Sequence, residues 1–298
     1  MENFPFTHKQ YLDNILDRTK YYFSADELER ISGALVVVAG LGASGSMVVE
    51  LLTRWGVGKF RLLDMDKYDY TNINRQLFAL PETVGKWKTE VATERIHQIN
   101  PFASVEFSFM EKLNLHNAEA LVKGADIVIN ATDTKSGFYL LHNFARKYKV
   151  PLIEGHGWRM TGTKVRVFDY RKNSQRAYDE PFSLGILNRF VRRFINSTKK
   201  PFEDMTQADV DALDSKDSMT GGSLGTTTSL VGAVIVTETI KLLSGRGKVL
   251  HHPNELYIDL FNMELKVMNK YSLRNIAGSF YKRRNEILKN FRGYFGRR

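Results

Sequence analysis

The feature that most constrains the fold is a glycine-rich turn that directly follows a short apolar run. The run, Leu35–Ala39, is rich in β-branched residues and ends at a glycine, as a strand buried on both faces does. Gly40, Gly42 and Gly45 follow with G-x-G-x-x-G spacing and open a segment with apolar residues at helical spacing. Such glycines let the chain turn tightly and let a phosphate approach the first turn of the helix. The sequence therefore predicts a β-α-β unit that binds a nucleotide.

Strand-like and helix-like segments keep alternating along the first half of the chain. Strands are predicted at 60–63, 105–109, 126–130 and 150–154, and helices at 47–55, 86–99 and 136–148. This alternation favours an α/β, Rossmann-like fold, in which helices flank a mostly parallel sheet.

The regular alternation of predicted strands and helices ends after about residue 160. Residues 164–170 alternate between polar and apolar, which suggests a strand of a second sheet region. Helices are predicted at 184–195, 207–213 and 226–243. Residues 256–260 and 265–268 favour a C-terminal antiparallel hairpin.

Acidic and basic residues follow the glycine turn in an order that suits ATP. Asp64 ends the next predicted strand, 19 positions after Gly45, where an acid can accept hydrogen bonds from ribose hydroxyls. Arg75 and Lys88 are expected to flank the same cleft, and the charge of a triphosphate requires cations there. A nicotinamide dinucleotide has no such need. For Lys88 the alternative interpretation is a solvated helix face.

Asp133 follows the apolar segment 126–130 and is a candidate magnesium ligand. Ligands of parallel sheets lie beyond the carboxyl ends of the strands, and Mg²⁺ prefers oxygen ligands. The alternative is that Asp133 caps the helix expected from Ser136. Both roles are compatible.

These residues lie within a longer pattern that resembles the ThiF/MoeB/HesA group of ubiquitin-activating-enzyme-like adenylyltransferases. The resemblance covers roughly residues 18–270. The glycine turn is followed by GVGKFRLLDMD, TNINRQ, VGKWK, QINP and INATD, and later by RMTGTKVRVF and TETIKLLSG.

The resemblance implies an activity and a set of roles. The activity is ATP-dependent activation of a carboxylate as an acyl-adenylate, most often the C-terminal glycine of a small ubiquitin-like sulfur carrier, or of a peptide. It also implies a homodimer in which an N-terminal arginine reaches the ATP of the partner, and Arg18 is the nearest candidate. The implied nucleotide loop is Gly40, Gly42 and Gly45, with Asp64 on the ribose, Asn72, Arg75 and Lys88 on the phosphates, and Asp133 on Mg²⁺.

The chain contains no cysteine. Disulfides, thiolate zinc sites and cysteine nucleophiles on this chain are therefore excluded. Many members of the group carry two Cys-x-x-Cys pairs for a structural zinc, so no zinc is expected here. A thioester or persulfide on the chain is likewise excluded, and the chemistry should stop at the adenylate or pass it directly to another nucleophile.

Two alternative functions remain open. The stretch from TNINRQ to QINP is also similar to relatives that dehydrate threonylcarbamoyladenosine in tRNA. The second alternative is an NAD-binding oxidoreductase or a nucleotide-binding protein without turnover, and the Arg75/Lys88 pair disfavours the oxidoreductase.

Four parts are expected along the 298 residues: a helical N-terminal arm (1–34), a Rossmann-like ATP-binding region (35–160), a substrate-binding and C-terminal part of the same domain (161–270), and a basic tail (271–298). The net charge of +10 favours an acidic partner, and the last 18 residues hold seven Lys or Arg. The tail is a candidate for contact with RNA or an anionic membrane, or a solvated end. Without a secretion signal or about 18 consecutive apolar residues, we expect a cytoplasmic protein.

Three weaker features lie outside this pattern. His156 and Trp158 follow a strand end and either line the substrate mouth or pack. The glycine and hydroxyl cluster from Met219 to Thr228 is either a carboxylate site or a plain cap. His251 and His252 are expected in a loop rather than at a metal.

Overall fold

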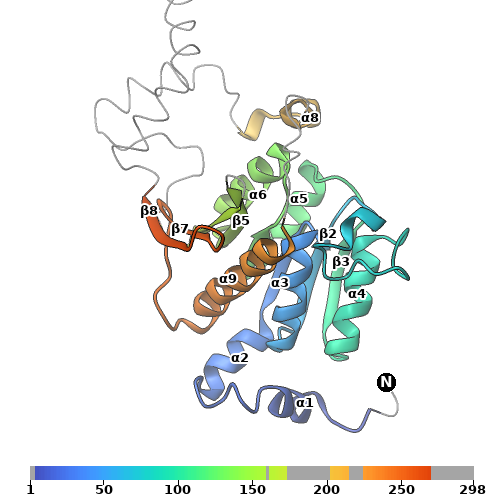
Figure 1. Cartoon of the computed structure of the whole chain (residues 1–298), viewed down its shortest axis with the longest axis vertical. Coiled ribbons are helices and arrows are strands. Elements are labelled where there is room, and N and C mark those ends of the chain that lie inside the picture. The colour runs from blue at the N-terminus through green and yellow to red at the C-terminus, as the bar shows by residue number, and fades with distance from the viewer. Residues whose placement is uncertain (1–3, 159–160, 173–201, 215–223, 270–298) are drawn as a thin grey trace, which may run out of the picture.

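The computed structural model describes residues 4–158, 161–172, 202–214 and 224–269 (Figure 1). Its strands form one eight-stranded sheet with the order β3-β2-β1-β4-β5-β6-β7-β8. Strands β1 to β5 are parallel, and β6, β7 and β8 continue the same sheet in antiparallel fashion. The strands are β1 (Leu35–Ala39), β2 (Lys59–Leu63), β3 (Ser104–Phe109), β4 (Ile127–Asn130), β5 (Leu152–Trp158), β6 (Gly162–Phe168), β7 (Asn254–Asp259) and β8 (Glu264–Asn269).

Helices cover both faces of the parallel part of the sheet, which confirms the Rossmann-like α/β prediction. One face packs against α3, α4 and α9, and the opposite face packs against α5 and α6. The described helices are α1 (His8–Ile15), α2 (Ala25–Gly33), α3 (Ala43–Arg54), α4 (Lys88–Ile99), α5 (Leu115–Val122), α6 (Lys135–Tyr148), α8 (Gln207–Asp214) and α9 (Gly225–Ser244), with short 3₁₀ turns η1 (Tyr70–Asn72) and η2 (Phe202–Asp204).

Alternate side chains of strand β1 are buried on opposite faces of the sheet. Val36 and Val38 contact the core under α3, whereas Val37 and Ala39 contact the core under α5 and α6. An unbroken apolar run is therefore required here, because each face of the strand meets a helical layer.

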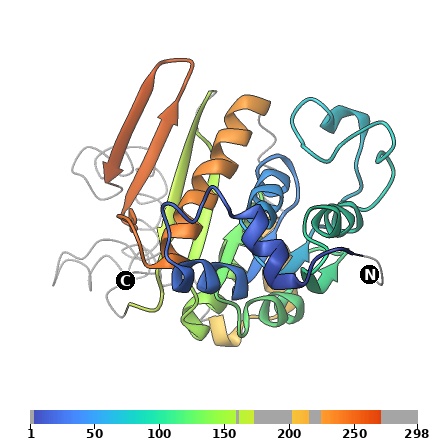
Figure 2. The same cartoon turned by 90° about the horizontal axis from the view of Figure 1, so that it is seen from below.

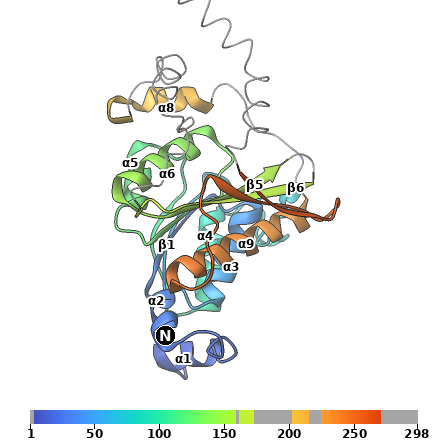
Figure 3. The same cartoon turned by 90° about the vertical axis from the view of Figure 1, so that its left-hand side faces the viewer.

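Helices α1 and α2 form the N-terminal arm and lie at the opposite end of the molecule from α8 (Figure 3). Both begin with a capping box, at Thr7 and at Ser24. Leu12 and Leu16 lie against Gly56 at the end of α3, and Arg30 donates a hydrogen bond to the carbonyl of Ser244 at the end of α9 (2.6 Å). These contacts join the arm to the base of the domain.

One expectation for the second half of the chain needs correction. The predicted strand at 164–170 is β6, and it belongs to the main sheet, because it pairs with β5 from Leu152 to Trp158. Among the described residues, α9 is the one helix long and apolar enough, by length and composition alone, to span a membrane. In this fold α9 packs on the sheet, where Gly155 of β5 directly meets Val231 and Ile235. Its apolar character is thus that of a core helix.

Candidate functional site

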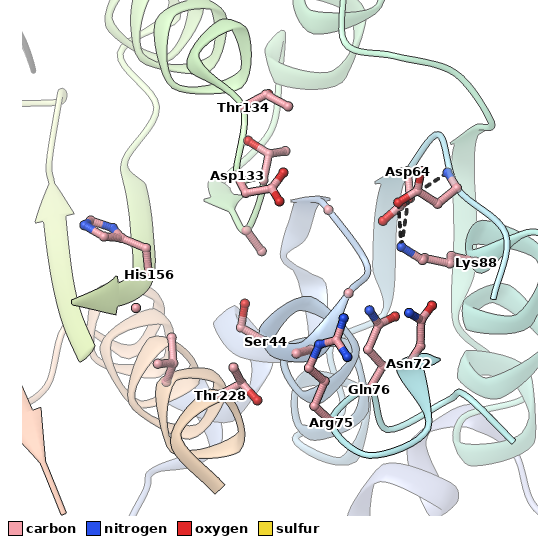
Figure 4. A pocket seen from close by; sticks show the side chains of 18 of the residues that line it. Ser44, Asp64, Asn72, Arg75, Gln76, Lys88, Asp133, Thr134, His156 and Thr228 are labelled. Carbon is pink, nitrogen blue, oxygen red and sulfur yellow. Dashed lines mark hydrogen bonds and ion pairs between the residues drawn. The ribbon is translucent and has the colours of Figure 1, made fainter. Parts of the chain in front are cut away.

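A cavity of about 1000 Å³ opens at the carboxyl ends of the parallel strands. The strand order reverses between β1 and β4, and open α/β sheets bind ligands at such a switch point. The loops after β1, β2 and β4, the end of β5 and the first turn of α9 all contribute to its wall (Figure 4). Of the predicted site residues, the cavity is lined by Gly40, Gly42, Asp64, Asn72, Arg75, Lys88 and Asp133.

Each glycine of the turn occupies its position for a different structural reason. Gly40 has a φ of +88°, and a Cβ there would lie 2.5 Å from the carbonyl oxygen of Ala131. A Cβ on Gly45 would lie 1.9 Å from the carbonyl oxygen of Gly40, so the turn closes on itself at this position. Gly42 is the N-cap of α3, and a Cβ there would be in ordinary contact with the Gln76 side chain, 3.7 Å from its Nε2. Gly45 is absent from the cavity lining, so its role is to let the loop close.

Asp64 and Lys88 form a buried polar group at the edge of the cavity. Asp64 accepts hydrogen bonds from the backbone N–H groups of Leu41 (2.6 Å) and Asp66 (2.9 Å). Burial raises the pKa of the Asp64 carboxyl, and the Lys88 ammonium, 3.6 Å away, opposes that rise.

A second carboxylate, that of Asp66, also contacts Lys88. No role was assigned to Asp66 from the sequence. The Lys88 ammonium lies 2.8 Å from Oδ2 of Asp66, and the side chain of Lys88 is only 6% exposed. A solvated helix face, the alternative considered for Lys88, is therefore wrong. The ammonium lies in the cavity wall between two carboxylates.

Arg75 and Asn72 lie on the loop that follows β2. Asp69 caps the 3₁₀ turn η1, and Asn72 completes the capping box by accepting from the Asp69 N–H. Arg75 donates to the carbonyl of Thr71 (2.6 Å), and its half-buried side chain lines the cavity. Helix α9 packs directly against this loop, because Gly225 at the start of α9 lies against the backbone of Asn74 and Arg75. Arg75 and Asp133 lie on opposite sides of the cavity (Figure 4).

Asp133 does not cap α6, which corrects that alternative. The N-cap is Thr134, whose hydroxyl accepts from the N–H of Gly137 (3.1 Å), and Asp214 accepts from the N–H of Ser136 (2.9 Å). Asp133 is exposed at the cavity, and no described residue donates a hydrogen bond to its carboxylate.

This carboxylate suits a Mg²⁺ ion that also binds phosphate oxygens, since Mg²⁺ commonly takes one or two protein carboxylates and keeps several waters. Within the described residues no three His, Asp or Glu side chains are grouped to hold a metal ion by themselves. The residues present therefore fit a metal that arrives with a nucleotide.

A buried ionic cluster lies beside the cavity on β5 and β6. Glu154 is fully buried, with its carboxylate 2.8 Å from Nε of Arg166 and 3.0 Å from Nε2 of His142. Burial alone would raise the pKa of Glu154, but Arg166 and His142 outweigh it and lower the pKa to about 2. His156, for which lining the mouth and packing were both open, lines the cavity, and burial together with Arg166 lowers its pKa to about 4, so its imidazole is neutral at pH 7.

Several predicted residues lie elsewhere. Arg18 is exposed between α1 and α2 and is absent from the cavity lining. His251 and His252 lie in the connection between α9 and β7, as expected: His251 forms an isolated bridge with Val167, and the ring of His252 stacks on Phe168 at 4.4 Å. The predicted helix at 184–195, most of the 219–228 cluster, the side chain of Trp158 and the basic tail lie outside the described residues.

Several polar residues that the fold brings to the cavity were assigned no role from the sequence. Ser44 lies within the glycine turn and Gln76 ends the TNINRQ segment, and Gln76 is buried with its Oε1 unpaired among the described groups. Thr227 and Thr228 belong to the first turn of α9 and line the cavity. Both are part of the glycine and hydroxyl cluster noted in the sequence. Only the packing of α9 against the Arg75 loop brings them near the other residues.

The sequence profile of the ThiF family matches residues 17–277 of this chain. The chain is 38% identical over 183 residues to the tRNA threonylcarbamoyladenosine dehydratase of Haemophilus influenzae, covering 60% of this chain and 67% of that protein. It is 28% identical over 222 residues to the sulfur carrier protein adenylyltransferase of Thermus thermophilus, covering 74% and 73%.

Among solved structures, Escherichia coli MccB in complex with MccA-N7isoASN has a TM-score of 0.68 at 17% identity. The match covers 87% of this chain and 73% of MccB. At this identity the likeness concerns the fold alone.

Proposed function

The chain belongs to the ThiF family, and on that premise we propose that it uses ATP to adenylate the C-terminal carboxylate of a small carrier protein or peptide. One observation carries the proposal. One cavity at the switch point of the sheet brings together Asp64, the cationic side chains of Arg75 and Lys88, and Asp133, whose carboxylate receives no hydrogen bond from any described residue.

The wall of the cavity supports a defined placement of ATP. The phosphates would lie over Gly40 and Gly42, at the N-terminus of α3, where N–H groups and the helix dipole favour anions. Asp64 would accept from the ribose hydroxyls. Asn72, Arg75 and Lys88 would neutralise the β- and γ-phosphates, and Lys88 would exchange part of its contact with Asp66 for phosphate oxygen.

The reaction is an in-line displacement at the α-phosphorus. A carboxylate oxygen of the substrate forms a bond to the α-phosphorus, and the bond from that phosphorus to the oxygen bridging to the β-phosphate breaks. Pyrophosphate leaves with that electron pair, and the acyl-adenylate remains. Arg75 and Lys88 stabilise the charge that develops on the leaving group, and positioning supplies much of the remaining acceleration.

Asp133 would hold Mg²⁺, which supplies further neutralisation of the phosphates. A general base is not needed, because a carboxylate is already ionised at neutral pH. Since the chain lacks cysteine, the adenylate would pass to a nucleophile that the substrate or another protein brings.

The family resemblance also predicts a homodimer in which Arg18 of one copy reaches the nucleotide of the other. Arg18 is exposed and lies outside the cavity lining of its own chain, as that arrangement requires.

A second candidate function is supported by the identity to the Haemophilus influenzae dehydratase. The threonyl part of threonylcarbamoyladenosine carries a carboxylate, so activation of that group would use the same cavity and the same chemistry. The two candidates differ in the macromolecule that carries the carboxylate.

ATP–pyrophosphate exchange separates the candidates. Exchange that appears with a Gly-Gly-ending carrier protein supports the first function, and exchange stimulated only by tRNA bearing threonylcarbamoyladenosine supports the second. Absence of exchange with either, together with tight binding of NAD, would refute adenylation and favour the oxidoreductase. An Asp133→Ala variant that keeps wild-type exchange would refute the magnesium assignment.

A further inference from the structure

Helix α8 lies across two loops that line the cavity. Its first residue, Gln207, accepts a hydrogen bond from the backbone N–H of Leu115 at the start of α5 (3.1 Å). Its last residue, Asp214, accepts from the N–H of Ser136 at the start of α6 (2.9 Å) and pairs with the Lys112 ammonium (3.0 Å). One side chain, that of Asp214, therefore contacts both the loop after β3 and the segment after β4.

These two loops start from strands that are not neighbours. Three strand spacings separate β3 from β4, which is about 14 Å at about 4.8 Å per strand. Each loop contributes a run of residues to the cavity lining, 111–113 after β3 and 132–134 after β4. Because β3 and β4 do not pair with each other, the distance between their loops depends on an element that contacts both, and α8 is such an element.

Helix α8 is anchored to the core of the domain. It packs on α6 and lies on the face of the sheet that α5 and α6 cover (Figure 2; Figure 3). Val210 is fully buried, and the ring of Phe202 packs against the rings of Phe144 (5.0 Å between centroids) and Tyr139 (5.8 Å) of α6. The position of Asp214 relative to the cavity is therefore set by apolar packing as well as by its own hydrogen bonds.

The contacts of Asp214 exceed what helix capping requires. Thr134 already caps α6, and Asp214 lies 78 positions after Ser136. The Asp214 side chain is 18% exposed, and it also accepts from the hydroxyl of Ser136 (2.6 Å). Burial alone would raise the pKa of the Asp214 carboxyl, but the hydrogen bonds from Ser136 and Lys112 outweigh it and lower the pKa. An ionised carboxylate is thus held between the two loops.

The base of a bound nucleotide would lie against the loop after β3. In the proposed placement of ATP, the phosphates lie over Gly40 and Gly42 after β1, and the ribose lies at Asp64 after β2. Strand β3 comes next in the sheet, so the base would continue in that direction toward residues 111–113. Lys112 is held at its ammonium, and its apolar stem would then lie along this part of the wall.

We propose that Asp214 of α8 is a positioning residue for the nucleotide: it joins the loop after β3 to the start of α6 and so fixes the wall that the base of ATP contacts. This inference rests on the proposed function, because it takes ATP as the ligand of the cavity. Coupling between two sites is reciprocal, so bound ATP should in turn stabilise the contacts of Asp214. A contact that serves stability alone would not respond to the nucleotide.

The test uses the whole 298-residue chain and separates the charge of Asp214 from its role as an acceptor. Asp214→Asn keeps an oxygen for the N–H of Ser136 and removes the charge that pairs with Lys112. Lys112→Met breaks the same ion pair from the other side. The matched control is Asp204→Asn, because Asp204 is exposed in the η2 turn before α8 and lies outside the cavity lining. Ile31→Val controls for lost stability, since Ile31 is fully buried in α2 of the arm.

Affinities for adenosine and for ATP are measured by isothermal titration calorimetry. Asp214→Asn and Lys112→Met are each expected to weaken adenosine binding by about 3- to 30-fold, as residues that act on a ligand through other residues do. The double variant should lose no more than the larger single loss, because both changes break one ion pair. Asp204→Asn and Ile31→Val should stay within about twofold of wild type.

Hydrogen exchange measures the same coupling from the other side. The N–H groups of Leu115 and Ser136 both donate to side chains of α8. Saturating ATP is expected to slow the exchange of these two amides in the wild-type chain by about the factor that Asp214→Asn loses in ATP affinity. The N–H of Gly58, which donates to the carbonyl of Ser32 at the base of the domain, is the control amide and should be unaffected.

Several results would overturn the positioning role. They are unchanged adenosine affinity in both single variants, an equal loss in Ile31→Val, or fully additive losses in the double variant, which would show that Lys112 and Asp214 act on the nucleotide separately. Exchange at Leu115 and Ser136 that ATP does not slow would leave Asp214 a purely structural role and overturn it as well.

Failure of this inference can be told apart from failure of the proposed function. A wild-type chain that binds neither ATP nor adenosine would overturn both. ATP binding that depends on Asp214, without ATP–pyrophosphate exchange on any carboxylate, would uphold the positioning role and refute the adenylation alone.

Discussion

Replacement of Lys88 by methionine tests the placement of the triphosphate most directly. Methionine keeps most of the buried volume of the lysine stem and removes the ammonium, which lies 2.8 Å from Asp66 and 3.6 Å from Asp64. The variant therefore changes the charge of the cavity wall with little change in its shape.

The expected loss follows from the burial of the ammonium. A hydrogen bond to a charged group contributes about 1.5–3 kcal/mol, and Lys88 is shielded from water, so the loss for ATP should be roughly 10- to 150-fold in affinity. Adenosine lacks the phosphates and should bind the variant within about threefold of wild type at neutral pH, because the phosphate contact is what the variant loses.

The variant also changes the pH dependence. Burial already raises the pKa of Asp64, and loss of the nearby ammonium should raise it further. An acid with a raised pKa takes up its proton at a higher pH, so ribose binding should weaken at a higher pH in the variant than in wild type as the solution is acidified.

The assay is calorimetric titration with ATP, AMP and adenosine from pH 5 to pH 8. Lys86→Met is the matched control, because Lys86 is exposed, two residues away and outside the cavity lining. Equal losses for ATP and adenosine at pH 8 would show that Lys88 does not contact the phosphates, and wild-type affinity for ATP would refute the placement altogether.

Three further predictions concern the scaffold of the cavity. Gly45→Ala should abolish ATP binding, because its Cβ would lie 1.9 Å from a backbone oxygen of the same loop, whereas Gly33→Ala, with nothing within 4 Å, should leave binding unchanged in the same titration. Glu154→Gln should lower the free energy of unfolding by about 3 kcal/mol at pH 7, since the pKa of about 2 lies well below the ordinary 4.5. Because the folded-state pKa is the lower one, this stability is present above pH 4.5 and is lost as the pH falls toward 2, so urea unfolding of wild type and variant should converge there. Asp214→Ala should cost about 1 kcal/mol in urea unfolding, because the N–H of Ser136 at the start of α6 loses its acceptor, and an unchanged midpoint would refute this.

Much of the parallel half of the fold was determined by local sequence. The apolar run at 35–39 and the glycines after it specify a buried strand, a tight turn and a helix, because these preferences act between neighbouring residues. Asp64 and Asp133 could be placed at the cavity for a related reason. Each ends or follows a predicted parallel strand, and such strand ends meet at one edge of the sheet.

The tertiary structure decided what neighbouring residues cannot specify. Local alternation marked residues 164–170 as a strand, but only pairing with β5 assigns it to the main sheet. The pairing of Lys88 with Asp66, the burial of Glu154 and the exposure of β8 depend on contacts between distant segments. From the sequence, Asp133 could be either a capping residue or a metal ligand. In the fold the hydroxyl of Thr134 caps α6, and the carboxylate of Asp133 lies in the cavity.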